Sequence, residues 1–256
     1  MLRESMNEKI LVKMYNKPYV IRFTKTNDEL DTVFIYTRDK REVEIFLAIL
    51  GANISLYEPD IKSQEIISWL SEKTYADILP TVKLTGKEHE EVLKCFDKIG
   101  IHPRVQERLQ DAFFKTKLDN SFIHKSSASN VMLSQYVSFE DTDIICLNAF
   151  YETEEIKLDH IADDHVEAML LTEISRQAGI AAAGVVQDPS KIFIILKEER
   201  LYKRFVKRDE PATIQVLCVA PKVAGYCVFS LIQEGVCCMK GCLVGRSFTN
   251  KEEYVR

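Results

Sequence analysis

Residues 163–179, DDHVEAMLLTEISRQAG, have the spacing of an α-helix that carries a charge within its apolar face. At about 100° per residue, Val166, Leu170, Glu173, Gln177 and Ile180 fall on one side of such a helix. Glu173 and Gln177 therefore lie at the centre of the apolar side. A carboxylate on a buried face is costly unless it is paired or protonated. The placement of Glu173 is the feature of this sequence that points to function.

The opposite side of the same helix is formed by small residues, namely Ala168, Thr172, Ser175, Gly179 and Ala182. A helix that is apolar or small nearly all round is usually buried. Asp164 is a suitable N-cap residue, and Glu167 three positions later completes a pattern typical of a capping box. We therefore predict a central, buried helix over residues 164–185, with Glu173 largely buried.

The spacing of Glu173, Arg176 and Gln177 allows the three side chains to meet, because residues three and four apart are neighbours on a helix. Two hypotheses follow. The three form a satisfied buried network that stabilises the fold, or they line a cleft in which desolvation raises the pKa of Glu173 and makes it a general acid or base. His160 and His165 bracket the start of the helix and are candidates to assist.

Segments rich in β-branched and aromatic residues, which favour strands, surround the predicted helix. They are VMLSQYVSF (131–139), DIICLNAFY (143–151), KIFIILKEERLYKRFV (191–206), TIQVLCVAP (213–221), GYCVFSLIQEG (225–235) and VCCMKGCLVGRSF (236–248). One long helix among several strands predicts a curved antiparallel sheet wrapped around that helix. We expect strands to enclose it from residue 128 onward.

The first 118 residues alternate short apolar strands with amphipathic helices. Strands are predicted at 9–15, 19–24, 31–38 and 53–60, and helices at 39–52, 61–73, 88–100 and 103–116. Alternation of this kind predicts a small α/β domain. The sequence contains no phosphate loop or dinucleotide fingerprint there, so the role of residues 1–118 stays open. A second domain is predicted over residues 119–256.

Composition excludes several classes of protein. The net charge of −5 gives no basic footprint for nucleic acid. No apolar run approaches the roughly 18 residues that a membrane span needs, and the first residues lack the apolar core of a signal peptide. Seven cysteines are present, but the CCxxxC of residues 237–242 is not a zinc spacing. We expect buried free thiols, no metal, and a cytoplasmic protein.

Two motifs resemble a known family. The segment IHKSSASNVMLSQ (123–135) precedes DHVEAMLLTEISRQAGIAAA (164–183). Together they resemble the A-factor biosynthesis (AfsA-type) hotdog domain, whose hallmarks are an HK segment leading into the first strand and an LLxExxRQA helix. The resemblance covers residues 119–256. It implies a hotdog fold, so the expected fold class is α+β, with a C-terminal hotdog domain preceded by the small α/β domain.

The resemblance also implies an activity. Family members with an assigned role transfer or condense β-ketoacyl groups from acyl carrier protein onto a small hydroxylated acceptor, in the synthesis of butenolide signals. We therefore expect an acyltransferase-like enzyme of secondary metabolism, with acyl carrier protein or CoA thioesters as substrates and no further cofactor. Glu173 is the expected acid or base, assisted by His160 or His165. The expected substrate-binding residues are Arg176, Gln177 and His124.

Alternatives remain open at this point. Hotdog dehydratases carry a histidine about fourteen residues before a helix glutamate, and His160 precedes Glu173 by thirteen, so thioester hydrolysis or dehydration on the same residues is one alternative. A non-catalytic acyl-binding or regulatory module is another. Butyrolactone-type relatives usually contain two hotdog domains in tandem, whereas the first half of this chain has no second helix with the LLxExxRQA motif. Hotdog domains usually pair, so a homodimer is expected.

Overall fold

The computed structural model describes residues 19–22, 33–36, 40–50, 54–56, 84, 87–101, 103–110, 115–138, 142–157, 164–187, 191–219, 224–250 and 252–255. The chain divides into two compact units. One unit contains residues 1–84, 98–104 and 140–142, and the other contains residues 85–97, 105–139 and 143–256. The strand at 9–15 and the helix at 61–73, which the sequence predicts, lie outside the described residues.

The first unit contains a small parallel sheet of strands β1 (Tyr19–Arg22), β2 (Val33–Tyr36) and β3 (Ile54–Leu56), in the order β2-β1-β3. Helix α2 (Lys40–Leu50) connects β2 to β3, as a crossover between parallel strands requires. The residues predicted for its apolar face, Val43, Phe46, Leu47 and Leu50, are buried, and so are Ile45 and Ile49. These elements lie within the ranges that the sequence predicts.

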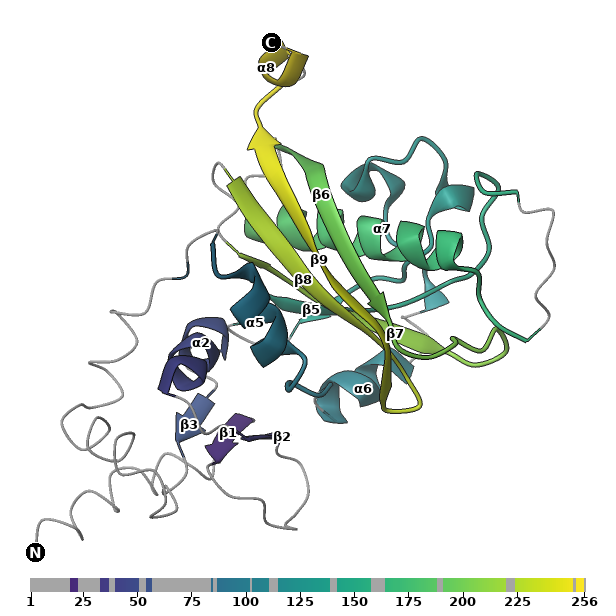
Figure 1. Cartoon of the computed structure of the whole chain (residues 1–256). Helices are drawn as coiled ribbons and strands as arrows, with labels where there is room; N and C mark the ends of the chain where they lie inside the picture. Colours follow the sequence, from purple (N-terminus) through teal and green to yellow (C-terminus); the bar gives the residue numbers. More distant parts are fainter. Residues whose placement is uncertain are drawn as a thin grey trace, which may run out of the picture. The chain divides into compact units, whose positions relative to one another are not determined.

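The second unit contains a six-stranded antiparallel sheet in the order β4-β5-β7-β8-β9-β6 (Figure 1). Its strands are β4 (Val137–Ser138), β5 (Ile144–Asn148), β6 (Ile192–Tyr202), β7 (Ala212–Val219), β8 (Ala224–Gln233) and β9 (Val236–Phe248). A tight turn at Glu234 and Gly235 joins β8 to β9, and both residues have positive φ, as two-residue hairpins favour.

Helix α7 (Ala168–Val186) packs along one face of this sheet, mainly against β7 and β8 (Figure 1). Small residues let the helix approach closely. A Cβ atom on Gly179 would lie 2.3 Å from Leu243 Cδ1 of β9. Residues 177–183 of α7 are all buried. The prediction of a central helix enclosed by an antiparallel sheet is confirmed.

The start of the helix differs from the prediction. Helix α7 begins at Ala168 rather than Asp164, and its N-cap residue is Glu167, which makes no side-chain cap bond. Residues before it are extended, since Val166 N donates to Val206 O at 2.8 Å. The Glu167 carboxylate accepts a hydrogen bond from Arg208 instead. The predicted capping box is therefore wrong, because tertiary partners hold the segment extended.

Several short helices complete the described structure. Helix α5 (His89–Phe96) contacts β8 and β9, and α6 (Pro103–Gln110) follows it. The 3-10 helices are η4 (Asn120–Ile123) and η5 (Ala128–Asn130), and α8 (Glu252–Val255) lies near the C-terminus. Helix η4 packs against α7. No helix in the described ranges is long and apolar enough to cross a membrane.

Candidate active site

Glu173 lies at the centre of a hydrogen-bonded network on α7, and its side chain is 13% exposed. Arg176 binds the carboxylate in a bidentate manner, because Nε donates to Oε2 and Nη2 donates to Oε1, both at 2.7 Å. Gln177 Nε2 donates to Oε1 at 2.9 Å. Lys125 Nζ lies 2.8 Å from the same oxygen. Four donor groups from three side chains thus satisfy the buried charge.

Gln177 connects the network to the chain segment that covers α7. It is fully buried. Its Oε1 accepts from Met132 N, and its Nε2 donates to Asn130 O, each at 2.9 Å. These backbone groups belong to an irregular segment, and buried backbone groups need partners. Gln177 therefore supplies the partners for this segment and holds it against the helix.

Lys125 contributes the second positive charge of the network. Its side chain is only 7% exposed, and it also forms an ion pair with Glu155. Lys125 follows η4, and its backbone N donates to Asn120 O at 2.8 Å. Lys125 belongs to the HK segment of residues 123–135, but its place in the sequence predicts no contact for it. The lysine lies far from Glu173 along the chain, so only the folded structure reveals their contact.

The electrostatics of Glu173 favour its charged form. Burial raises its pKa, but the bonds from Arg176, Lys125 and Gln177 outweigh burial and lower the pKa to about 2. Glu173 in turn raises the pKa of Arg176. The raised pKa that the cleft hypothesis assigned to Glu173 is therefore wrong. The alternative of a satisfied network describes what the structure contains.

Arg176 is the most exposed member of the network. Its side chain is 33% exposed, and Glu173 engages its Nε and Nη2 atoms. Within the described residues, Nη1 has no hydrogen-bond partner. Arg200 of β6 contacts the same helix, because its Nε donates to Ser175 Oγ at 2.9 Å. No signal in the sequence identified Arg200, because its position depends on the sheet.

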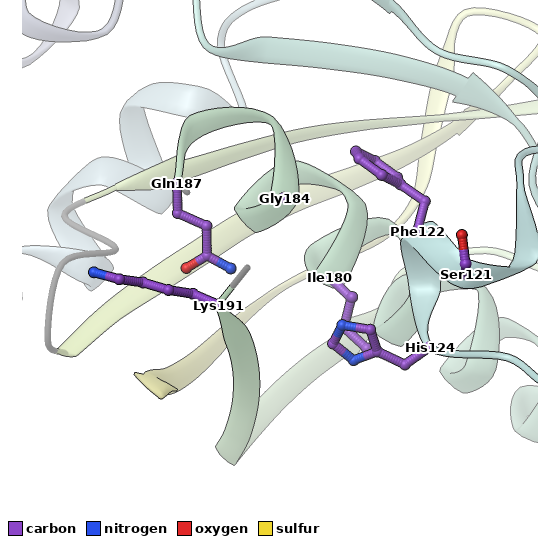
Figure 2. A pocket seen from close by; sticks show the side chains of 7 residues that line it. All are labelled: Ser121, Phe122, His124, Ile180, Gly184, Gln187 and Lys191. Carbon is purple, nitrogen blue, oxygen red and sulfur yellow. The ribbon is translucent and has the colours of Figure 1, made fainter. Parts of the chain in front are cut away.

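His124 ends η4 in the left-handed conformation, with φ at 58°. Its pKa is lowered by burial and by the charge of Arg176. The imidazole lines a cavity of about 60 Å³ beside the second half of α7 (Figure 2). The lining residues are Ser121, Phe122, His124, Ile180, Gly184, Gln187 and Lys191. Glu173 does not line this cavity.

The other two predicted histidines lie apart from these contacts. His165 Nδ1 is 2.7 Å from Asp164 Oδ1, and its ring packs on Phe205 with the centroids 5.0 Å apart. Its described contacts do not include Glu173. His160 lies outside the described residues. Throughout the described ranges, no group of three His, Cys, Asp or Glu side chains is placed to hold a metal ion. All seven cysteines are free thiols.

Comparisons with solved structures find distant matches. A thioesterase of Haemophilus influenzae is 13% identical, with 50% of this chain and 87% of that chain covered and a TM-score of 0.41. A mutant thioesterase of Pseudomonas aeruginosa is 10% identical, with coverages of 56% and 91% and a TM-score of 0.38. The PaaI protein of Escherichia coli is 10% identical, with coverages of 44% and 81% and a TM-score of 0.36.

The family assignment rests on sequence. No curated protein matches the chain. The family model described as the A-factor biosynthesis hotdog domain matches residues 106–234, which is half of the chain. The matched range contains the whole of α7 and the bonds among Lys125, Glu173, Arg176 and Gln177. The antiparallel sheet wrapped around α7 is the arrangement that a hotdog domain requires. This chain belongs to the A-factor biosynthesis hotdog domain family.

Proposed function

We propose that this protein is an acyl-thioester enzyme that transfers or condenses an acyl group from acyl carrier protein or CoA onto a small acceptor, in signal or secondary-metabolite synthesis. The observation that supports this most is the Arg176 guanidinium, which Glu173 holds in a fixed orientation on the helix of an A-factor biosynthesis hotdog domain. A fixed, partly exposed cation suits the stabilisation of charge that develops on a carbonyl oxygen.

Arg176 is the proposed catalytic residue, because Glu173 occupies Nε and Nη2 and leaves Nη1 available to donate to a substrate oxygen. The acceptor attacks the thioester carbonyl carbon, negative charge develops on the carbonyl oxygen, and the C–S bond then breaks. The departing sulfur takes up the proton that the acceptor loses. Glu173 is a positioning residue in this scheme, since a carboxyl group with a pKa of about 2 is a weak base at neutral pH.

The proton needs a carrier, and we propose His165, whose ring contacts Asp164 and Phe205 and would reach the reacting groups only through a bound substrate. Asp164 Oδ1 accepts a hydrogen bond from His165 Nδ1 at 2.7 Å, which orients the ring. His165 precedes the first turn of α7, where the leading backbone N–H groups of a helix have no partner within the helix. Such groups favour negative charge on a nearby oxygen. His160 stays a second candidate for the same role.

A non-catalytic acyl-binding module is the second candidate function, and one observation favours it. Every oxygen of Glu173 already has partners in the described structure, so the network stabilises the fold without any substrate. In this case Arg176 would orient an acyl carrier protein or a thioester without reacting. The two candidates differ in whether the thioester is consumed.

The test is turnover of thioesters followed by mass spectrometry. The full chain is incubated with a panel of acyl-CoA and acyl-carrier-protein thioesters, with and without small hydroxylated acceptors. We expect acyl groups on the acceptor, and a loss of about 100-fold or more in Arg176→Lys. Arg204→Lys, at an exposed arginine, is the matched control and should retain activity. Free acid would indicate hydrolysis instead, and an intact thioester would favour the module.

We also propose that the protein is a homodimer joined at strand β6. Among the described strands, β6 lies at the edge of the sheet and pairs only with β9. An unpaired edge of 11 residues is a template for another strand. Leu196, Leu201 and Tyr202 on this strand are 65%, 54% and 44% exposed. A second copy would cover both the edge and these apolar side chains, as a two-fold interface does.

A further inference from the structure

The cavity beside His124 lies apart from the Glu173 network, and nothing in the proposed thioester chemistry requires it. Ile180 lines the cavity. It follows Glu173 by seven residues, which is about 10 Å along a helix axis. One wall comes from η4, another from the end of α7, and Lys191 closes it just before β6 (Figure 2). The cavity therefore brings together two stretches that are distant in sequence, residues 121–124 and residues 180–191.

The backbone of His124 is held in an unfavourable conformation. A non-glycine residue in the left-handed region costs about 1–2 kcal/mol, and His124 has a φ of 58°. Its backbone N–H is satisfied by Ser121 O at 3.2 Å. Among the described residues, the imidazole itself has no hydrogen-bond partner. A strained residue that directs an unpaired polar ring into a cavity indicates a role for that ring.

Two further donors face the cavity from the other side. Ser247 Oγ donates to Gln187 Oε1 at 2.6 Å, which fixes the amide and leaves its NH₂ group for the cavity. Lys191 lines the same side and has no carboxylate partner within the described part of the chain. Figure 2 shows Gln187 and Lys191 together, opposite the His124 ring. The cavity thus combines one cation, one amide donor and one imidazole.

The remaining walls are apolar and the space is small. Phe122, Ile180 and the backbone of Gly184 form them. A Cβ atom on Gly184 would lie 3.2 Å from Phe122 Cζ, so the glycine lets the ring sit against the helix. A volume of about 60 Å³ admits only a few non-hydrogen atoms, since one water molecule needs about 10–15 Å³ on this scale. A long acyl chain does not fit.

We propose that this cavity is a binding site for a small monocarboxylate of about two to four carbons, with Lys191, Gln187 and His124 around the carboxylate and Phe122 and Ile180 against the alkyl group. A carboxylate accepts hydrogen bonds from several donors at once, and charge-assisted bonds to an ammonium group are strong. The apolar walls select an organic acid over a fully hydrated inorganic anion. Arg176 does not line this cavity, and the binding that we propose needs no thioester.

The experiment is a titration of the full chain with sodium butyrate, followed by ligand-observed NMR or calorimetry. Butyramide, which has the same shape without the charge, and inorganic phosphate are the comparison ligands. Lys191→Met should weaken butyrate binding about tenfold or more, because it removes a charged hydrogen-bond donor. His124→Asn removes the ring while asparagine tolerates the left-handed backbone, and it should weaken binding too. Lys157→Met, at an exposed lysine, is the matched control.

The outcomes are distinct. Saturable butyrate binding that Lys191→Met weakens and Lys157→Met leaves unchanged supports the site. Equal binding of butyramide would overturn it, since the cavity would then select only for shape. Equal binding of phosphate, or butyrate binding that Lys191→Met does not alter, would overturn it as well. Melting temperatures of the variants show that each one folds, so a loss of binding is not a loss of structure.

Discussion

Replacement of Glu173 by glutamine tests the electrostatic role of the network most directly. Glu173→Gln keeps the size of the side chain but removes the charge that Arg176 and Lys125 share. The Lys125 side chain is 7% exposed, so its ammonium group cannot turn to water without moving the segment that covers α7. Lys125 would keep only the half-exposed Glu155 as a counter-charge, and the loss of a buried partner from an ion pair is destabilising. We expect the variant to fold with a lower free energy of unfolding.

The magnitude follows from the pKa of Glu173. Its ordinary value is 4.5, and the network lowers it to about 2. Each pKa unit corresponds to about 1.36 kcal/mol, so the charged form contributes about 3 kcal/mol of stability, and somewhat less because the site is partly exposed. In a chain of this size, about 1 kcal/mol shifts the melting temperature by about 2–4 °C. We expect Glu173→Gln to melt about 5–10 °C below the wild type at neutral pH.

The sign of the pH dependence makes the test specific. Folding lowers the pKa of Glu173, so its stabilisation is complete above the unfolded value near pH 4.5 and is lost as the pH falls toward about 2. Urea denaturation of both proteins from about pH 3 to pH 7 should show a difference that shrinks to about half or less near pH 3. Glu155→Gln, whose side chain is 49% exposed, is the control and should have a small effect. Equal stabilities at pH 7, or a difference that does not change with pH, would refute the reasoning.

Three further predictions concern other contacts. Gln177→Leu should lower the free energy of unfolding by about 1–3 kcal/mol, because Met132 N loses its buried acceptor; urea denaturation measures this. Gly179→Ala should also lower the free energy of unfolding by about 1–3 kcal/mol, because the added Cβ would lie 2.3 Å from Leu243 Cδ1. An unchanged melting temperature would contradict this close packing. Leu201→Lys should shift sedimentation from dimer to monomer at micromolar concentration if β6 is the dimer edge, and a wild type that sediments only as a monomer would rule out that dimer.

The parts of the fold that sequence could predict are those governed by local periodicity. Helix α7 and the strands around it follow from the 3.6-residue and 2-residue spacing of apolar positions. The contacts of Glu173 with Arg176 and Gln177 follow for the same reason, because residues three and four apart must be neighbours on any helix. The family resemblance adds the hotdog arrangement, which spacing alone does not specify.

The parts that could not be predicted depend on partners distant in the chain. Sequence placed the start of α7 at Asp164, but Val206 and Arg208 hold that segment extended. Lys125 reaches Glu173 only because η4 packs against α7. Desolvation alone raises the pKa of a carboxyl group, which is why one of the two hypotheses drawn from the sequence expected a raised pKa for Glu173. Local spacing indicates that the Glu173 carboxylate is buried, but it does not indicate how many hydrogen-bond donors surround that carboxylate.

The low pKa of Glu173 also constrains how activity depends on pH. Glu173 stays ionised at every pH above about 4, since its pKa is about 2, and Arg176 stays charged because Glu173 raises its pKa. Neither group can produce a change of rate near neutral pH. We therefore expect that any fall in kcat/KM between about pH 7 and pH 5 is due to a group other than Glu173 or Arg176. His165→Gln should abolish that fall if His165 carries the proton, whereas Glu173→Gln should lower the rate and leave the pH midpoint in place. If the pH midpoint of kcat/KM moves in Glu173→Gln but not in His165→Gln, the Glu173 carboxylate transfers the proton instead.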